Sequence, residues 1–141
     1  MEKLRVLFVC IHNSARSQMG EAFLNEIAGD RFHAESAGLE AGKLNPRVVK
    51  AMAEIGYDLS QNKTNSVFDY LKEERKYDYV ITVCDGASGE RCPIFPGKSK
   101  RIHMEFRDPS SLTGSDEEKM IEIRKIRDEI KDFVTEWVKV V

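Results

Sequence analysis

Short apolar runs alternate along the chain with segments in which apolar residues recur every three or four positions. Residues 4–9 form the first apolar run, and its length suits a buried strand of a parallel sheet. From Ser17 to a suitable helix end at Gly29, apolar residues follow at helical spacing, namely Met19, Phe23 and Ile27. The chain is therefore expected to begin with a strand, a tight loop and a helix.

The middle of the chain continues this order. A short strand is expected over residues 33–36. A helix is expected from Asn45-Pro46 to Gly56, because Asn is a favoured helix cap and Pro fits the first turn. The apolar residues that this helix should turn inward are Val49, Met52 and Ile55.

Further elements are expected in the second half. A short helix over residues 66–74 precedes a strand over 77–83, and another strand is expected near 101–104 after a polar loop. Ser115 and Glu118 form a capping box at the start of the last helix. Its apolar stripe then follows at helical spacing: Ile123, Ile126, Ile130, Phe133 and Trp137.

This alternation predicts an α/β fold, with residues 1–141 forming a single catalytic domain around a parallel sheet that has helices on both faces. In such sheets ligands bind beyond the carboxyl ends of the strands. Three residues with reactive side chains follow predicted strands: Cys10, Cys84 and Asp108. We expect all three at the same edge, where a binding or catalytic site should lie.

Composition narrows the functional classes. The chain has 141 residues and a net charge of −2, which gives no electrostatic reason to expect nucleic acid or membrane partners. The first apolar run is too short for a signal peptide, and no segment has the length of a membrane span. We therefore expect a cytoplasmic monomer. In that reducing compartment three cysteines are more often buried, metal-bound or reactive than paired for stability.

The segment from Cys10 to Ser17 has the pattern of an anion-binding loop, in which Arg16 follows Cys10 after five residues: Ile11, His12, Asn13, Ser14 and Ala15. A loop that closes from a strand into a helix points backbone N–H groups inward, and the helix dipole adds positive charge. Arg16 can hold a tetrahedral oxyanion with two parallel hydrogen bonds, and the same field favours the Cys10 thiolate. Ser17 is placed to donate its hydroxyl to that thiolate. The alternative is a buried Cys after a strand and an Arg in a surface ion pair.

The run Val6-Leu-Phe-Val-Cys10-Ile-His-Asn13-Ser-Ala-Arg16-Ser17-Gln-Met-Gly-Glu21-Ala22 closely resembles the opening of the low-molecular-weight protein tyrosine phosphatase superfamily. The resemblance continues through Glu35-Ser36-Ala37-Gly38, Val83-Cys84-Asp85, Cys92-Pro93 and Arg107-Asp108-Pro109, and is strongest for the thioredoxin-coupled arsenate reductases. It implies a phosphotyrosine-phosphatase-I-like fold, in which helices flank a four-stranded parallel sheet in three layers.

Two enzymatic outcomes share this loop. In a reductase, Cys10 would attack arsenate, with phosphate and sulfate as competing anions. Cys84 would then attack Cys10, and Cys92 would move the disulfide outward by thiol–disulfide exchange for reduction by thioredoxin. In a phosphatase, Cys10 would take the phosphoryl group and Asp108 would protonate the leaving group. Phosphatases of the superfamily often have aromatic residues after Asp-Pro, where this chain has Ser110-Ser111, which favours the reductase.

The sequence disfavours two other functional classes, a zinc site and a non-catalytic module. Zinc is disfavoured, because Cys84 and Cys92 lack two further ligands at suitable spacing. A non-catalytic module that binds an oxyanion or senses oxidation through Cys10 is disfavoured by the presence of Arg16 and of the acid candidate Asp108.

The fit departs from the family in two places. The interval between Cys84 and Cys92 is one residue longer than is usual in the reductases. No cofactor is required, but the resemblance also implies a potassium site formed by Asn13, Glu21, Ser36 and Asn65. Asn65 stands where the family has an Asp, and a neutral amide in place of a carboxylate weakens cation binding. The alternative for Asn13 is a left-handed backbone conformation within the loop.

Overall fold

The computed structural model describes residues 3–84, 95 and 97–141. The described strands form one parallel sheet in the order β2-β1-β3-β4. They are β1 (Leu4–Cys10), β2 (Phe32–Gly38), β3 (Tyr79–Thr82) and β4 (Lys100–His103). The predicted four-stranded parallel sheet is therefore confirmed, although β2 is longer and β3 shorter than the sequence patterns indicated.

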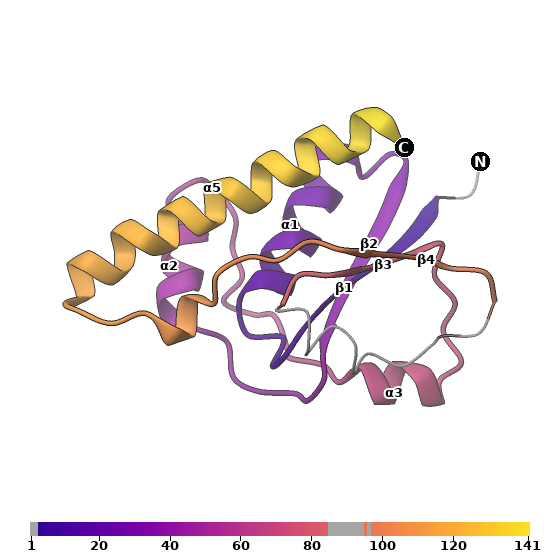
Figure 1. Cartoon of the computed structure of the whole chain (residues 1–141), viewed down its shortest axis with the longest axis horizontal. Helices are drawn as coiled ribbons and strands as arrows, with labels where there is room; N and C mark the ends of the chain where they lie inside the picture. Colours follow the sequence, from indigo (N-terminus) through magenta and orange to yellow (C-terminus); the bar gives the residue numbers. More distant parts are fainter. Residues whose placement is uncertain (1–2, 85–94, 96) are drawn as a thin grey trace.

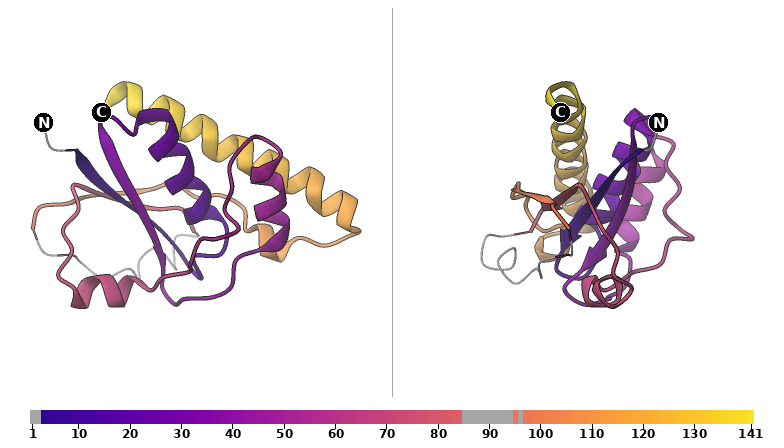
Figure 2. Two further views of the ribbon diagram at one scale, coloured as in Figure 1. Left: turned by 180° about the vertical axis from the view of Figure 1, so that it is seen from behind. Right: turned by 90° about the vertical axis from the view of Figure 1, so that its right-hand side faces the viewer.

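Helices cover both faces of this sheet (Figure 1). On one face lie α1 (Arg16–Ala28), α2 (Pro46–Ala53) and the long α5 (Asp116–Val140), and on the other lies α3 (Val67–Lys72). A short 3-10 helix, η1 (Pro109–Ser111), precedes α5. The views of Figure 2 show α5 lying along the outside of α1 and α2. The expected three-layer α/β arrangement is confirmed.

The two layers of helices explain why β1 is apolar from Val6 to its end. Successive residues of a strand point to opposite faces. Val6, Phe8 and Cys10 therefore join the core beneath α1, α2 and α5, whereas Leu7 and Val9 join the core beneath α3. Because both faces of the sheet are covered, residues 6–10 of β1 form a continuous apolar run in the sequence.

Helix starts follow the predicted signals closely, whereas α2 ends at Ala53 and not at the predicted Gly56. The Asn45 side chain accepts hydrogen bonds from the first N–H groups of α2, and Ser115 and Glu118 form the capping box of α5. The prediction for the inward face of α2 is confirmed for Met52 and wrong for Val49, because the buried residues of this helix are Val48, Ala51 and Met52. Val49 and Ile55 are only half-buried and pack against the edge of the core.

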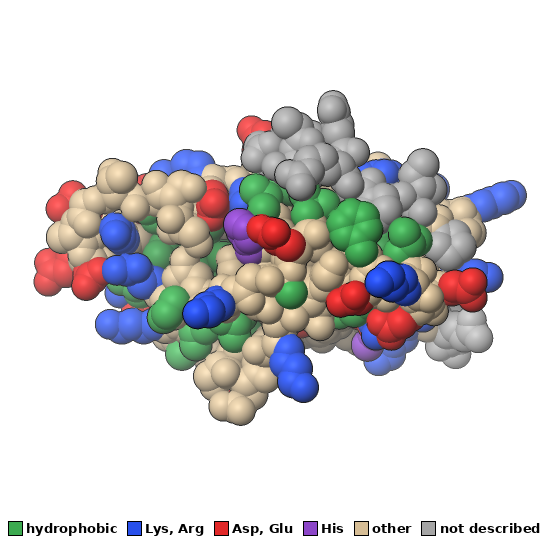
Figure 3. Space-filling model, turned by 90° about the horizontal axis from the view of Figure 1, so that it is seen from below, with side chains coloured by type: hydrophobic (Ala, Val, Ile, Leu, Met, Phe, Trp, Pro, Cys, Tyr) green, Lys and Arg blue, Asp and Glu red, His purple; other side chains and the backbone are tan. Residues whose placement is uncertain are grey.

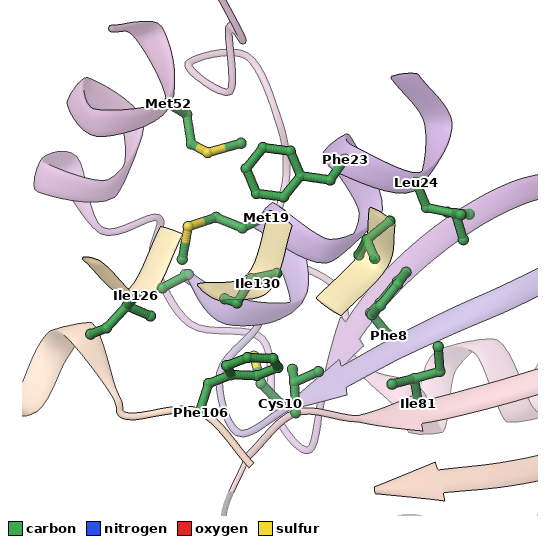
Figure 4. Packing of buried hydrophobic residues seen from close by; sticks show 14 of the residues in the cluster. Phe8, Cys10, Met19, Phe23, Leu24, Met52, Ile81, Phe106, Ile126 and Ile130 are labelled. Carbon is green, nitrogen blue, oxygen red and sulfur yellow. The ribbon is translucent and has the colours of Figure 1, made fainter. Parts of the chain in front are cut away.

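The larger core is centred on α1, as Figure 4 shows. Phe23 and Met19 of α1 lie among the side chains of α2 and α5, and both are fully buried. Ile123, Ile126 and Ile130 form the predicted stripe of α5 and are likewise fully buried. This packing fixes α1, and with it the loop from which α1 begins.

The surface carries charges of both signs. Figure 3 shows one face on which basic and acidic side chains are scattered among uncharged atoms instead of gathering into a patch of one sign. Within the described residues, no helix is both long and apolar enough to cross a membrane.

Candidate active site

Residues 10–16 connect the carboxyl end of β1 to the first turn of α1. The first N–H groups of a helix have no partner within the helix, so they are available to a ligand in front of it. Cys10, Asn13, Arg16 and Ser17 are all buried at this junction. The loop predicted from the sequence therefore lies at this junction, and the structure brings these four residues together.

Backbone carbonyls of the loop point outward. Four of them accept hydrogen bonds of 2.9–3.0 Å from N–H groups of residues 39–45, and they belong to Cys10, Ile11, His12 and Ser14. In a planar trans peptide the carbonyl and the following N–H point in opposite directions. The N–H groups that follow these carbonyls therefore face the inside of the loop, as an anion-binding nest requires.

Gly38, the last residue of β2, lets the sheet approach this loop. A Cβ atom at Gly38 would lie 2.6 Å from the backbone nitrogen of Asn13 and 2.6 Å from the carbonyl oxygen of Glu40. Both are backbone atoms, which cannot move aside as a flexible side chain can. The absence of a side chain at Gly38 therefore allows the loop to lie directly against β2.

Asn13, Ser17 and Cys10 form a line of hydrogen-bonding groups. Asn13 has a φ of 54°, which matches the left-handed backbone expected of it. Its Nδ2 donates to Ser17 Oγ at 2.8 Å, and Ser17 Oγ lies 2.8 Å from Cys10 Sγ. The predicted contact between Ser17 and the Cys10 sulfur is present.

Arg16 and Asp108 meet beside the loop. Arg16 Nη1 donates to the carbonyl oxygen of Phe106 at 3.0 Å, and its Nη2 lies 3.9 Å from Asp108 Oδ2. The Asp108 side chain is about one third exposed and also accepts a hydrogen bond from the Ser110 N–H at 2.9 Å. A pocket of about 530 Å³ is lined here by Arg16, Glu105, Phe106, Arg107, Asp108 and Glu129. The acid candidate thus has access to solvent and to the same opening as Arg16.

Cys84 lies in the core at the neighbouring strand end. The Val83 N–H donates to the carbonyl oxygen of Val9 at 2.9 Å, so the end of β3 lies directly beside the end of β1. Cys10 and Cys84 are both buried in the same apolar cluster, and Figure 4 shows Cys10 next to Phe106. The structure therefore places two of the three predicted thiols at adjacent strand ends, while Cys92 lies outside the described residues.

The residues of the implied potassium site form two hydrogen-bonded pairs, Asn13 with Asn65 and Glu21 with Ser36. Asn13 Oδ1 accepts the backbone N–H of Asn65 at 2.9 Å and the Asn65 Nδ2 at 3.5 Å. Ser36 Oγ donates to Glu21 Oε1 at 3.1 Å. Burial raises the pKa of Glu21 to about 7, although the hydrogen bond from Ser36 opposes this shift.

Sequence reasoning missed a buried amide next to Ser17. The Gln18 Nε2 donates to the carbonyl oxygen of Asn13 at 3.2 Å, to Asn13 Oδ1 at 3.2 Å and to the carbonyl oxygen of Lys63 at 3.1 Å. The only signal in the sequence is that Gln18 directly follows Ser17. Its hydrogen bonds with residues 62–63 produce no periodic pattern in the sequence.

Comparisons with known proteins agree with this geometry. Residues 5–141 match the family model described as low molecular weight phosphotyrosine protein phosphatase. An arsenate reductase of Halalkalibacterium halodurans is 42% identical over 130 residues, which cover 92% of this chain and 91% of the relative.

Solved structures give the same result. An arsenate reductase in a phosphate-binding state superposes with a TM-score of 0.76 at 25% identity, covering 98% of both chains. A thioredoxin-dependent arsenate reductase of Corynebacterium glutamicum superposes with a TM-score of 0.61 at 29% identity, covering 94% of this chain and 62% of that one.

Proposed function

The chain belongs to the low molecular weight phosphotyrosine protein phosphatase family, and within it we propose that the protein is a thioredoxin-dependent arsenate reductase. The observation that carries this proposal is the pair of buried thiols, Cys10 and Cys84, at the ends of two hydrogen-bonded strands. A phosphatase needs only the first of these thiols. The second supports a reaction in which electrons as well as a group are transferred.

The loop supplies binding and the first attack. Inward N–H groups and the Arg16 guanidinium hold the arsenate oxygens, and the Cys10 thiolate forms a bond to arsenic while one oxygen leaves as water. Asp108, at the opening of the pocket beside Arg16, is the donor of the proton that the leaving oxygen needs. The product of this step is a covalent adduct between Cys10 and arsenic.

Cys84 completes the reduction. Its thiolate attacks the Cys10 sulfur, a Cys10–Cys84 disulfide forms, and the electron pair of the sulfur–arsenic bond leaves with arsenic as arsenite. Arsenic gains two electrons, and the two thiols together lose two. Cys92 then attacks Cys84, which frees the Cys10 thiolate and moves the disulfide to Cys84–Cys92, where a dithiol such as thioredoxin reduces it. The reaction consumes reduced thiols, which is consistent with an enzyme working in the reducing cytoplasm.

A resident cation is not needed for any of these steps, and the residues present do not fit one well. Asn13 Oδ1, which would be a ligand, already faces N–H donors from Gln18 and Asn65. The Glu21 carboxyl group already accepts a hydrogen bond from Ser36 Oγ at 3.1 Å. We expect the melting temperature to be the same in potassium and sodium chloride. An Asn65→Asp variant, which replaces an amide by a carboxylate, should become more stable in potassium than in sodium.

The deciding experiment supplies arsenate, thioredoxin, thioredoxin reductase and NADPH and follows NADPH consumption. The parent should turn over many times, Cys10→Ser should not turn over at all, and Cys84→Ser and Cys92→Ser should lose multiple turnover. Peptide mapping after one turnover without reductant should find a Cys84–Cys92 disulfide. Undiminished turnover in either Cys84→Ser or Cys92→Ser would refute the relay.

A phosphomonoester phosphatase is the second candidate, because Asp108 lies at the same pocket opening as Arg16. That activity requires neither Cys84 nor Cys92. Fast hydrolysis of an aryl phosphate that is lost in Asp108→Asn but retained in Cys84→Ser, together with no arsenate turnover, would establish the phosphatase instead.

A further inference from the structure

We propose that Gln18 is a positioning residue for Cys10, because its side-chain amide fixes the direction of a chain of hydrogen bonds that ends at the Cys10 sulfur. The inference rests on the nucleophilic role proposed above for Cys10. Its experiment, however, needs no arsenate, so it can fail while the reductase proposal stands, and the reverse also holds.

The orientation of the Gln18 amide is set by residues 62–63. Gln18 is 1% exposed, and its Nε2 donates to the carbonyl oxygen of Lys63 at 3.1 Å. Its Oε1 accepts from the Nδ2 of Asn62 at 3.0 Å. A carbonyl oxygen can only accept and an amide NH₂ can only donate. The Lys63 carbonyl therefore permits one orientation of the Gln18 amide, and the Asn62 amide is oriented to match it.

Gln18 and the backbone N–H of Asn65 together set the orientation of the Asn13 amide. With Nε2 on this side, Gln18 can contact only an acceptor, and it lies 3.2 Å from Asn13 Oδ1. The backbone N–H of Asn65, another donor, approaches the same oxygen at 2.9 Å. With its oxygen held by two donors, the Asn13 side chain must present its NH₂ group on the other side, toward Ser17.

The chain of hydrogen bonds ends at sulfur. Ser17 Oγ accepts from Asn13 Nδ2 at 2.8 Å, which leaves its one hydrogen available for the Cys10 Sγ, 2.8 Å away. A hydroxyl hydrogen bond to a charged acceptor is stronger than one to a neutral acceptor, so this arrangement favours the thiolate. Gln18 also donates to the backbone carbonyl of Asn13 at 3.2 Å, which supports the left-handed conformation of that residue.

The ionisable groups around Cys10 belong to other parts of the site. They are Arg16 at the start of α1, Glu21 one turn further along, Cys84 after β3 and Asp108 before η1. Gln18 makes no hydrogen bond with any of them among the described residues. Substituting Gln18 therefore changes the hydrogen-bond chain and leaves the charges in place.

The test measures the rate at which iodoacetamide alkylates Cys10 between pH 5 and pH 9, by mass spectrometry of the tryptic peptide 6–16. Gln18→Leu keeps a similar volume and removes every hydrogen bond of the amide. We expect the pH midpoint of Cys10 alkylation to rise by about one unit, which is a tenfold change in the thiolate equilibrium. An unchanged midpoint would overturn the proposal.

Asn62→Asp provides a second perturbation at a half-buried position, in case Gln18→Leu does not fold. A carboxylate at position 62 cannot donate to Gln18 Oε1, and its oxygens repel that atom, which disfavours the present orientation of the Gln18 amide. The pH midpoint of Cys10 alkylation should therefore rise again. In a Gln18→Leu background the same substitution should add nothing. A shift of equal size in both backgrounds would mean that the new charge acts through space, and would contradict the proposal.

Asn25→Leu is the matched control. Asn25 lies on the same helix, and its amide exchanges two hydrogen bonds with the Ala34 backbone, at 2.8 and 3.0 Å. Its loss should destabilise the protein without moving the midpoint of Cys10 alkylation. If Asn25→Leu moves the midpoint as far as Gln18→Leu does, the effect of Gln18 is general loosening of α1 and the positioning role is wrong.

Discussion

The closest packing between α1 and the sheet lies at Gly20, and it predicts the result of a single substitution. A Cβ atom at Gly20 would lie 2.6 Å from Cδ1 and 2.8 Å from Cε1 of the Phe8 ring. Phe8 is fully buried in β1, so the ring has no solvent to move into. In Gly20→Ala either the ring or the whole helix must therefore shift.

Two opposing effects decide the magnitude. Alanine in a helix interior is favoured over glycine by about 1 kcal/mol. Overpacking a close-packed core costs about 1–3 kcal/mol. Because the contact distances are far below van der Waals separation, the upper part of that range applies, and Gly20→Ala should lower the free energy of unfolding by roughly 1–2 kcal/mol. For a chain of this size that corresponds to a fall in Tm of about 3–6 °C.

Urea denaturation followed by Trp137 fluorescence measures this change, and a double-mutant cycle identifies its cause. Phe8→Leu replaces the ring by a smaller side chain, and the cavity that this leaves should by itself lower the free energy of unfolding. In that background Gly20→Ala should be nearly neutral or stabilising, which gives a coupling of about 1 kcal/mol or more. If Gly20→Ala is as stable as the parent, or if Phe8→Leu does not reduce its cost, the packing argument is refuted.

Three further substitutions test other parts of the structure. Arg16→Lys loses the planar guanidinium, including the hydrogen bond to Phe106, and kcat/KM for the oxyanion should fall by roughly 100-fold, measured by initial rates. Ser115→Ala removes the cap of α5 and should cost about 1 kcal/mol in urea denaturation. Hydrogen bonding and charge from Arg124 lower the pKa of Glu54 to about 2, so Glu54 contributes stability above pH 4.5 that is lost as the pH falls toward 2. The stability difference between Glu54→Gln and the parent should therefore be largest at pH 6 and shrink toward pH 2. A constant difference would contradict the ion pair.

Much of the fold could be predicted because burial imposes a period on the sequence. From Val6 to Cys10, β1 is covered on both faces and is therefore continuously apolar, and the apolar stripe of α5 recurs at helical spacing. The cap residues Asn45 and Ser115 were identifiable because few side chains can accept the first N–H groups of a helix. The inward face of α2 was less certain, because adjacent valines at 48 and 49 leave its phase open.

The candidate site was predictable only as far as its residues follow one another along the chain. Cys10, Arg16 and Ser17 lie within one loop, and their chemistry follows from that loop. The contacts of Gln18 with Asn62 and Lys63 join segments about 45 positions apart. Hydrogen bonds between amides do not require apolar residues at regular intervals, so no pattern in the sequence predicts them.

The position of β1 in the sheet also bears on how the protein folds. Its pairing with β2 is nearly local, because α1 is the one helix between them. Its pairing with β3 joins residues far apart in the sequence, such as Val6 and Tyr79. Closing so long a segment costs entropy before any contact repays it. The β1–β3 junction, beside which Cys10 and Cys84 are buried, should therefore form late. On dilution from denaturant, recovery of enzymatic activity should then lag behind the recovery of helical circular dichroism.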